Sequence, residues 1–213
     1  GMKLASGHYK EGLGRSLGFL VGALVVGTAF PHLLKSLTMH LSWEYVVYTT
    51  SALAAAGGAC ILLLVPDGPY RKAAQKFSMG NFAKGFAIKE FRSIAFGYFG
   101  HMWELYTFWA FVPVMLGAYN SRYPAAQLNI PLLSFIIIAC GGAACVISGL
   151  LSQRFGAKRI ATVSLTLSCA CCLASPSFLF ITSAGIMITF LFFWGLVVIG
   201  DPPLFSTLVA RSA

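Results

Sequence analysis

The stretch GLLSQRFGAKR, residues 149–159, is a short basic segment between two long apolar ones. Residues 130–152 come before it and residues 159–180 follow it, and a transmembrane helix needs about 20 predominantly apolar residues. Charged side chains are costly in the hydrocarbon core, whereas basic ones are common in the loops at its edge. The stretch therefore predicts a surface loop that joins two membrane spans.

The composition of the whole chain is that of a membrane protein. Of its 213 residues, 58% are hydrophobic and only 10% are charged, whereas soluble domains carry about 25% charged residues. Backbone groups in lipid must be satisfied within their own segment, so each apolar segment of spanning length is predicted to be an α-helix. The predicted spans are residues 15–36, 44–65, 92–117, 130–152, 159–180 and 184–209. The expected fold class is an all-α polytopic membrane protein.

The basic residues predict the orientation of these spans. All of the 15 Lys and Arg residues except Lys35 and Arg122 fall on the side that carries both chain ends. Cytoplasmic loops carry the excess of Lys and Arg, so both ends are predicted to be cytoplasmic. Topology thus explains the net charge of +9, and no nucleic-acid partner is expected.

The long connection at residues 66–91 has a pattern of its own. PDGP, residues 66–69, predicts a turn. Beyond it, Met79, Phe82 and Phe86 fall on one helical face with lysines around them. This pattern predicts a basic amphipathic helix on the cytoplasmic membrane surface, and a plain solvated linker is the alternative.

Small residues within the spans predict close helix contacts. Gly18 and Gly22 form GxxxG in the first span, and AAAGGA occupies residues 54–59 of the second. The fourth span contributes Gly141, Gly142, Cys145 and Gly149. The six cysteines all lie in apolar segments and are interpreted as packing residues. The sequence shows neither a nucleophile–base constellation nor a metal cluster, so we expect no enzyme activity, metal or cofactor.

Two acidic residues, Glu104 and Asp201, lie deep within predicted spans. Glu104 is about 12 residues, or roughly 18 Å, into its span, and His101 shares its helix face. A charge at this depth costs about 2.5–3.5 kcal/mol on insertion scales, so it must face the bundle interior or a cavity. One interpretation is a proton-coupling or transport site. The alternatives are a structural Glu104–His101 hydrogen bond, or a partner for Glu104 on another helix.

Asp201 is followed by Pro202 and Pro203 and preceded by Gly200. Proline removes a backbone donor and clashes with the preceding turn, so the helix should kink or open there and free carbonyl groups. Transporters place substrate and ion sites at broken helices near the midplane. The alternative is that Asp201 only caps the broken segment through a local backbone amide.

The loop GLLSQRFGAKR resembles the short signature of the major facilitator superfamily, which is roughly G-x-L-[AS]-D-R-x-G-R-[KR]. The positions that fit or nearly fit are Gly149, Leu151, Ser152, Arg154, Gly156, Lys158 and Arg159. Gln153 replaces the usual acid, and Ala157 stands where a basic residue is common. The resemblance implies a cytoplasmic gating motif formed by Gly149, Arg154, Gly156, Lys158 and Arg159; a plain topology anchor is the alternative.

The resemblance covers nearly the whole chain and implies a partial major facilitator fold, the fifth to tenth of twelve transmembrane helices. Residues 1–65 would hold the last two helices of the N-terminal half, 66–91 the cytoplasmic linker, and 92–213 the first four helices of the C-terminal half. The other helices of the parent chain would be its partners. GYFGHMWELYTFWAFVP, residues 97–113, is similar to bacterial members, which implies the bacterial inner membrane.

In this family the seventh and tenth helices line the central cavity, and by this register they carry Glu104 and Asp201. The implied cavity-lining residues are Tyr98, Phe108, Trp194 and Phe205. The expected function is secondary transport of a small solute across the bilayer by alternating access, with protons coupled through Glu104, His101 and Asp201. The alternative is a transport-inactive fragment or scaffold whose buried polar residues are structural.

Overall fold

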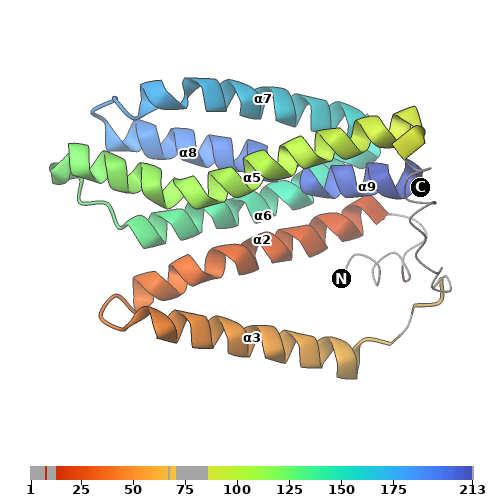
Figure 1. Cartoon of the computed structure of the whole chain (residues 1–213), viewed down its shortest axis with the longest axis horizontal. Coiled ribbons are helices and arrows are strands. Elements are labelled where there is room, and N and C mark those ends of the chain that lie inside the picture. Colours follow the sequence, from red (N-terminus) through yellow and green to blue (C-terminus); the bar gives the residue numbers. More distant parts are fainter. Residues whose placement is uncertain (1–7, 9–12, 67, 71–85, 213) are drawn as a thin grey trace.

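The computed structural model describes residues 8, 13–66, 68–70 and 86–212. Its elements are α2 (Leu13–Leu37), α3 (Trp43–Leu64), α5 (Lys89–Arg122), the 3-10 helix η1 (Pro124–Ala126), α6 (Ile130–Phe155), α7 (Ala157–Phe178), α8 (Ala184–Ile199) and α9 (Pro202–Ser212). No strand occurs in the described residues, which confirms the predicted all-α fold (Figure 1). The amphipathic helix predicted around Met79 and Phe82 lies outside the described residues.

Five segments of the described chain are long and apolar enough to cross a membrane. They are Gly14–Leu37, Trp43–Leu64, Ile130–Phe155, Ala157–Phe178 and Ala184–Leu208. The remaining predicted span, residues 92–117, lies within α5, which has 34 residues but is not among the five. Polar side chains such as His101 and Glu104 lower its mean hydropathy, and α5 extends beyond the predicted limits at both ends.

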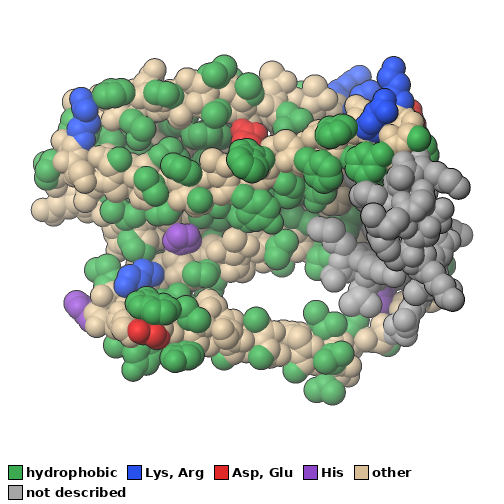
Figure 2. Space-filling view, viewed as in Figure 1, with side chains coloured by type: hydrophobic (Ala, Val, Ile, Leu, Met, Phe, Trp, Pro, Cys, Tyr) green, Lys and Arg blue, Asp and Glu red, His purple; other side chains and the backbone are tan. Residues whose placement is uncertain are grey.

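The surface has the distribution of side chains expected of an integral membrane protein. Hydrophobic side chains cover the middle of the face in view, and Lys and Arg side chains lie towards its ends (Figure 2). Large apolar residues are also widely exposed, for example Trp103 at 80% and Leu62 at 85%. In water such exposure would favour aggregation, whereas lipid accepts it.

Helices α5, α6, α7, α8 and α9 form one bundle, and α2 packs along α6 (Figure 1). The core of the bundle contains large buried side chains from α5, α6 and α8, among them Leu116, Tyr119, Ile137, Ile138, Met187 and Leu191. Helix α3 diverges from α2 after the turn that joins them, and none of its residues is buried. No heavy atom of the described chain lies within 4 Å of a Cβ built on Gly57 or Gly58. The contact predicted for AAAGGA is therefore not made at these two glycines.

The contact between α2 and α6 brings the two backbones together. A Cβ on Gly18 would lie 2.9 Å from the Cys145 carbonyl oxygen, and one on Gly22 would lie 2.7 Å from that of Gly142. Conversely, a Cβ on Gly142 would lie 2.8 Å from the Gly22 carbonyl oxygen. Only glycine permits this approach, which confirms the helix contact predicted from GxxxG.

Gly22→Leu is expected to destabilise the protein, because the new side chain would collide with the Gly142 backbone, which has no rotamer to change. Overpacking of this kind costs about 1–3 kcal/mol. Thermal unfolding in detergent micelles, followed by tryptophan fluorescence, measures the loss. Gly27→Leu is the matched control, because nothing lies within 4 Å of a Cβ at that position. Equal melting temperatures for the two variants would contradict the close contact.

Candidate functional site

The last spanning segment is interrupted in the middle of the bundle. Helix α8 ends at Ile199 and α9 begins at Pro202, with Gly200 and Asp201 between them. The prolines cannot donate hydrogen bonds, and the Leu204 amide donates to the Asp201 carbonyl at 2.9 Å instead of to the residue before it. The carbonyl groups ahead of Asp201 thus lose their helical partners, as the proline pair predicts.

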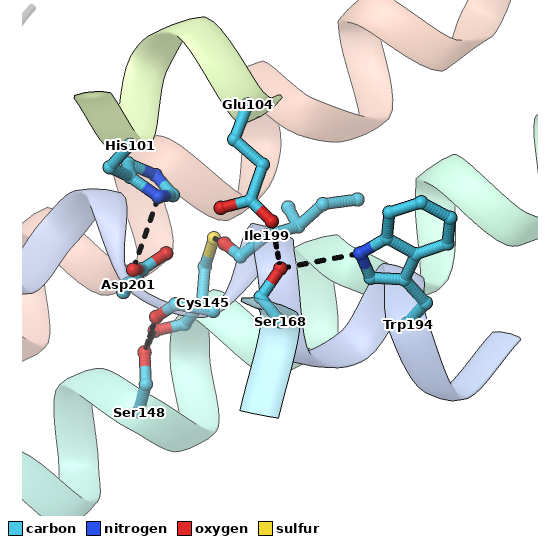
Figure 3. Close-up of polar contacts among 9 residues, drawn as sticks. His101, Glu104, Cys145, Ser148, Ser168, Trp194, Ile199 and Asp201 are labelled. Carbon is cyan, nitrogen blue, oxygen red and sulfur yellow. Dashed lines mark hydrogen bonds and ion pairs between the residues drawn. The ribbon is translucent and has the colours of Figure 1, made fainter. Parts of the chain in front are cut away.

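Two side chains of α6 bind the carbonyl groups freed at this interruption. The Cys145 thiol donates to the Ile199 carbonyl oxygen at 2.9 Å, and the Ser148 hydroxyl donates to that of Gly200 (Figure 3). Both side chains are buried. Sequence reasoning treated Cys145 as a packing residue and did not single out Ser148. The available signal was two small hydrogen-bond donors, three residues apart, on one face of an apolar helix.

The Asp201 carboxylate points from the interruption towards His101 of α5 (Figure 3). His101 Nδ1 lies 3.2 Å from Asp201 Oδ2, and both side chains are 1% exposed. The distance suits an ion pair, but the ring is not aligned for a hydrogen bond, and Asp201 Oδ1 has no hydrogen-bond partner in the described residues. The carboxylate therefore faces another helix. Pro202 and Pro203 have no N–H to offer it, and the Leu204 amide donates to the Asp201 carbonyl oxygen.

An aromatic ring covers one side of this pair. The Phe205 ring stacks on His101 and on Tyr98, with ring centroids 5.5 Å and 5.7 Å apart and an angle of 18° between the planes in each case. Phe205 lies one helical turn after Asp201, and Tyr98 lies one turn before His101. Two of the implied cavity-lining residues, Tyr98 and Phe205, are therefore in direct contact beside the pair.

Glu104 has a separate set of partners. The Ser168 hydroxyl of α7 donates to Glu104 Oε1 at 2.5 Å, and Trp194 Nε1 of α8 donates to Ser168 Oγ at 3.3 Å (Figure 3). The hydrogen bond between His101 and Glu104, one of the alternatives, is not formed, because neither ring nitrogen of His101 has a hydrogen-bond partner in the described chain. Glu104 is held from another helix, through a serine that the sequence alone did not indicate.

Two predicted cavity-lining residues lie in packed core. Phe108 and Trp194 contact each other with ring centroids 5.0 Å apart, and both are buried. They adjoin the Glu104 hydrogen bonds rather than an open space in this conformation. Their assignment to a solute pathway stays a prediction that requires the bundle to open.

The predicted gating motif forms the tight connection between α6 and α7. Gly156 has φ 85° and ψ 137°, a conformation that side chains rarely allow, and Gly149 faces the Gly14 backbone of α2. The basic residues Arg154, Lys158 and Arg159 are exposed, and none forms an ion pair with an acid in the described part of the chain. Their gating role stays a prediction.

Gly156→Ala is expected to destabilise the connection, because the native φ of 85° is unfavourable for any residue with a Cβ. Backbone strain of this kind costs about 1–3 kcal/mol, which thermal unfolding in detergent can detect. Gly100→Ala within α5 is the control, since it adds the same methyl group to open space in a regular helix. An unchanged melting temperature for Gly156→Ala would show that the loop relaxes freely.

Comparison with known proteins identifies the family. The sequence model described as Major Facilitator Superfamily matches residues 1–213. No curated protein and no solved structure matches the chain. The match confirms the resemblance drawn from the loop GLLSQRFGAKR, and the superfamily is one of membrane solute transporters. The chain belongs to the major facilitator superfamily.

Proposed function

We propose that the protein moves a small solute across the membrane by alternating access, coupled to protons through His101 and Asp201. The observation that carries the proposal is the contact of 3.2 Å between these two almost fully buried side chains. The pair joins α5 to the interruption of a spanning segment. Ionisable residues inside a membrane mark proton relays, and interrupted helices in transporters hold substrate and ion sites.

The net charge of the His101–Asp201 pair depends on its protonation, and that charge decides whether the pair is stable away from water. With one proton shared between imidazole and carboxylate, the pair is neutral overall and suits a water-free core. Without that proton it carries one negative charge, which is costly to bury unpaired. Loss of the proton therefore favours a conformation that admits water or a solute to Asp201. Alternating access requires that the binding or loss of a proton change the relative stability of two conformations.

A groove lies next to the Phe205 ring that stacks on His101, and neither His101 nor Asp201 lines it. It has a volume of about 520 Å³ and runs between α5, α7 and α9. Glu90 and Lys158 line it near the first turns of their helices, and Phe205, whose ring stacks on His101, is part of its wall. Under the predicted topology, this groove opens to the cytoplasm.

The proposal includes the roles and location that the family resemblance implies. The described helices would be the fifth to tenth of twelve, in a bacterial plasma membrane, with both chain ends cytoplasmic. The side chains of Tyr98, Phe108, Trp194 and Phe205 would line the solute path once the bundle opens. The motif at residues 149–159 would help to close the cytoplasmic side. Its basic residues would bind the C-termini of helices or acidic side chains.

Asp201→Asn is expected to lower proton-driven accumulation of the solute about tenfold, a typical size for a coupling free energy, and to retain exchange. The assay incubates proteoliposomes with isotope-labelled small metabolites and identifies the accumulated compound by mass spectrometry, with and without a pH gradient. Glu44→Gln, at the first turn of α3, is the matched acid-to-amide control. Normal accumulation by Asp201→Asn would refute the coupling role. Absence of any accumulated compound with the unmodified protein would favour a transport-inactive scaffold.

We propose Glu104 as a further proton-coupling residue of the same cycle. Its hydrogen bond to Ser168 favours a second candidate role, in which it holds α5 to α7 and α8 without moving protons. We expect Glu104→Gln to reduce proton-driven accumulation while leaving the melting temperature close to that of the unmodified protein. An amide at this position can still accept from Ser168, so the helix contact survives. A large fall in melting temperature, with normal accumulation by the remaining folded protein, would establish the structural role instead.

A further inference from the structure

The carbonyl groups at the interruption are satisfied by a neighbouring helix. A buried carbonyl left without a partner costs about 1–3 kcal/mol, and lipid offers no water to replace one. Ile199 and Gly200 obtain their donors from Cys145 and Ser148, both on α6. The segment directly ahead of Asp201 is therefore fixed by α6, on the opposite side from the contact that Asp201 makes with α5.

Helix α6 packs in direct contact with this segment. A Cβ on Gly141 would overlap the Ile199 side chain, and one on Gly200 would lie 3.7 Å from Ala144 Cβ. Ser148 also donates to the Cys145 carbonyl at 3.0 Å, which restrains its hydroxyl between two acceptors. A shift of α6 along its axis would consequently displace the residues that orient the Asp201 carboxylate.

The same turns of α6 form the contact with α2. The Cys145 carbonyl oxygen faces Gly18, while its thiol binds the Ile199 carbonyl. Gly142, one turn earlier, faces Gly22. One residue thus takes part in both contacts: its backbone carbonyl faces α2, and its side chain binds the interruption.

We propose that Cys145 and Ser148 are positioning residues, which hold Asp201 opposite His101 and make its protonation depend on the contact between α2 and α6. This inference rests on the proposed proton coupling and adds residues that touch neither proton nor solute. When α2 moves relative to α6, the backbone at Cys145 moves, the two donors shift, and the distance from Asp201 to His101 changes. Movement of α2 during the solute cycle then reaches the proton site through the α6 backbone and the side chains of Cys145 and Ser148.

The chain supplies matched controls for both side chains. Cys140 donates to Ile137 and Ser134 donates to Ile130, so each binds a carbonyl of its own helix, at 2.9 Å and 2.8 Å. Replacing either with alanine removes the same atoms as the corresponding change at Cys145 or Ser148. It leaves the carbonyl groups of Ile199 and Gly200 bonded.

The test measures the pH profile of proton-driven accumulation in proteoliposomes. Cys145→Ala and Ser148→Ala are expected to shift its midpoint by about one pH unit, equivalent to about 1.4 kcal/mol, while Cys140→Ala and Ser134→Ala do not. Cys145→Ser, which keeps a donor, is expected to restore the profile. If Asp201→Asn loses proton-driven accumulation but the midpoints of Cys145→Ala and Ser148→Ala do not shift, the positioning role is overturned and the proposed function is retained. Normal coupling in Asp201→Asn would overturn both.

A spectroscopic measurement does not need the solute. Infrared difference spectra between acid and neutral pH are expected to contain a carboxyl band that Asp201→Asn removes. We expect Ser148→Ala to move this band and Gly18→Ala, which presses on the Cys145 carbonyl, to move it too. Gly27→Ala, on the same helix with open space around it, should leave it in place. A band that stays fixed in Ser148→Ala and Gly18→Ala would refute the link.

Discussion

Two consecutive prolines inside a spanning helix cannot return hydrogen bonds to the carbonyl groups one turn earlier. In lipid this leaves polar groups that only protein can satisfy. Cys145 donates to the Ile199 carbonyl, one turn before Pro203, and Ser148 donates to that of Gly200, because the Leu204 amide donates to Asp201 instead. These two bonds fix how closely α6 must approach. Gly141 of α6 follows from that approach, because the Ile199 side chain lies where a Cβ would be.

Polar contacts then attach α5 to the rest of the bundle. The attraction of apolar faces is weak in lipid, so packing and hydrogen bonds between helices must hold spans together. His101 meets Asp201 at the interruption, and Glu104 meets Ser168 on α7. These two contacts lie one turn apart on α5 but lead to different helices, so the two acids need not perform the same task.

The sequence predicted the existence of the spans well, because length and apolarity are local properties. It also predicted the interruption at Asp201 and the glycine contact of α2, since proline and glycine act on their own backbone. It did not predict that Asp201 meets His101, or that Ser168 holds Glu104, because such partners depend on how distant helices rotate about their axes. The faces of an apolar spanning helix hardly differ in hydrophobicity, so the sequence pattern does not show which face turns towards which neighbouring helix. The polar face of α5 also made that span less apolar than the others.

The contact between α2 and α6 has a consequence for biosynthesis. Helices enter the membrane in chain order, so α2 is in the bilayer before α6 has left the ribosome. Until then Gly18 and Gly22 lack their partners on α6, and α3, which follows α2 in the chain, buries none of its own residues. The nascent chain must therefore hold α2 beside the translocon, or allow it to diffuse freely, until α6 arrives. The contact between α2 and α6 can therefore form only after α6 has been synthesised.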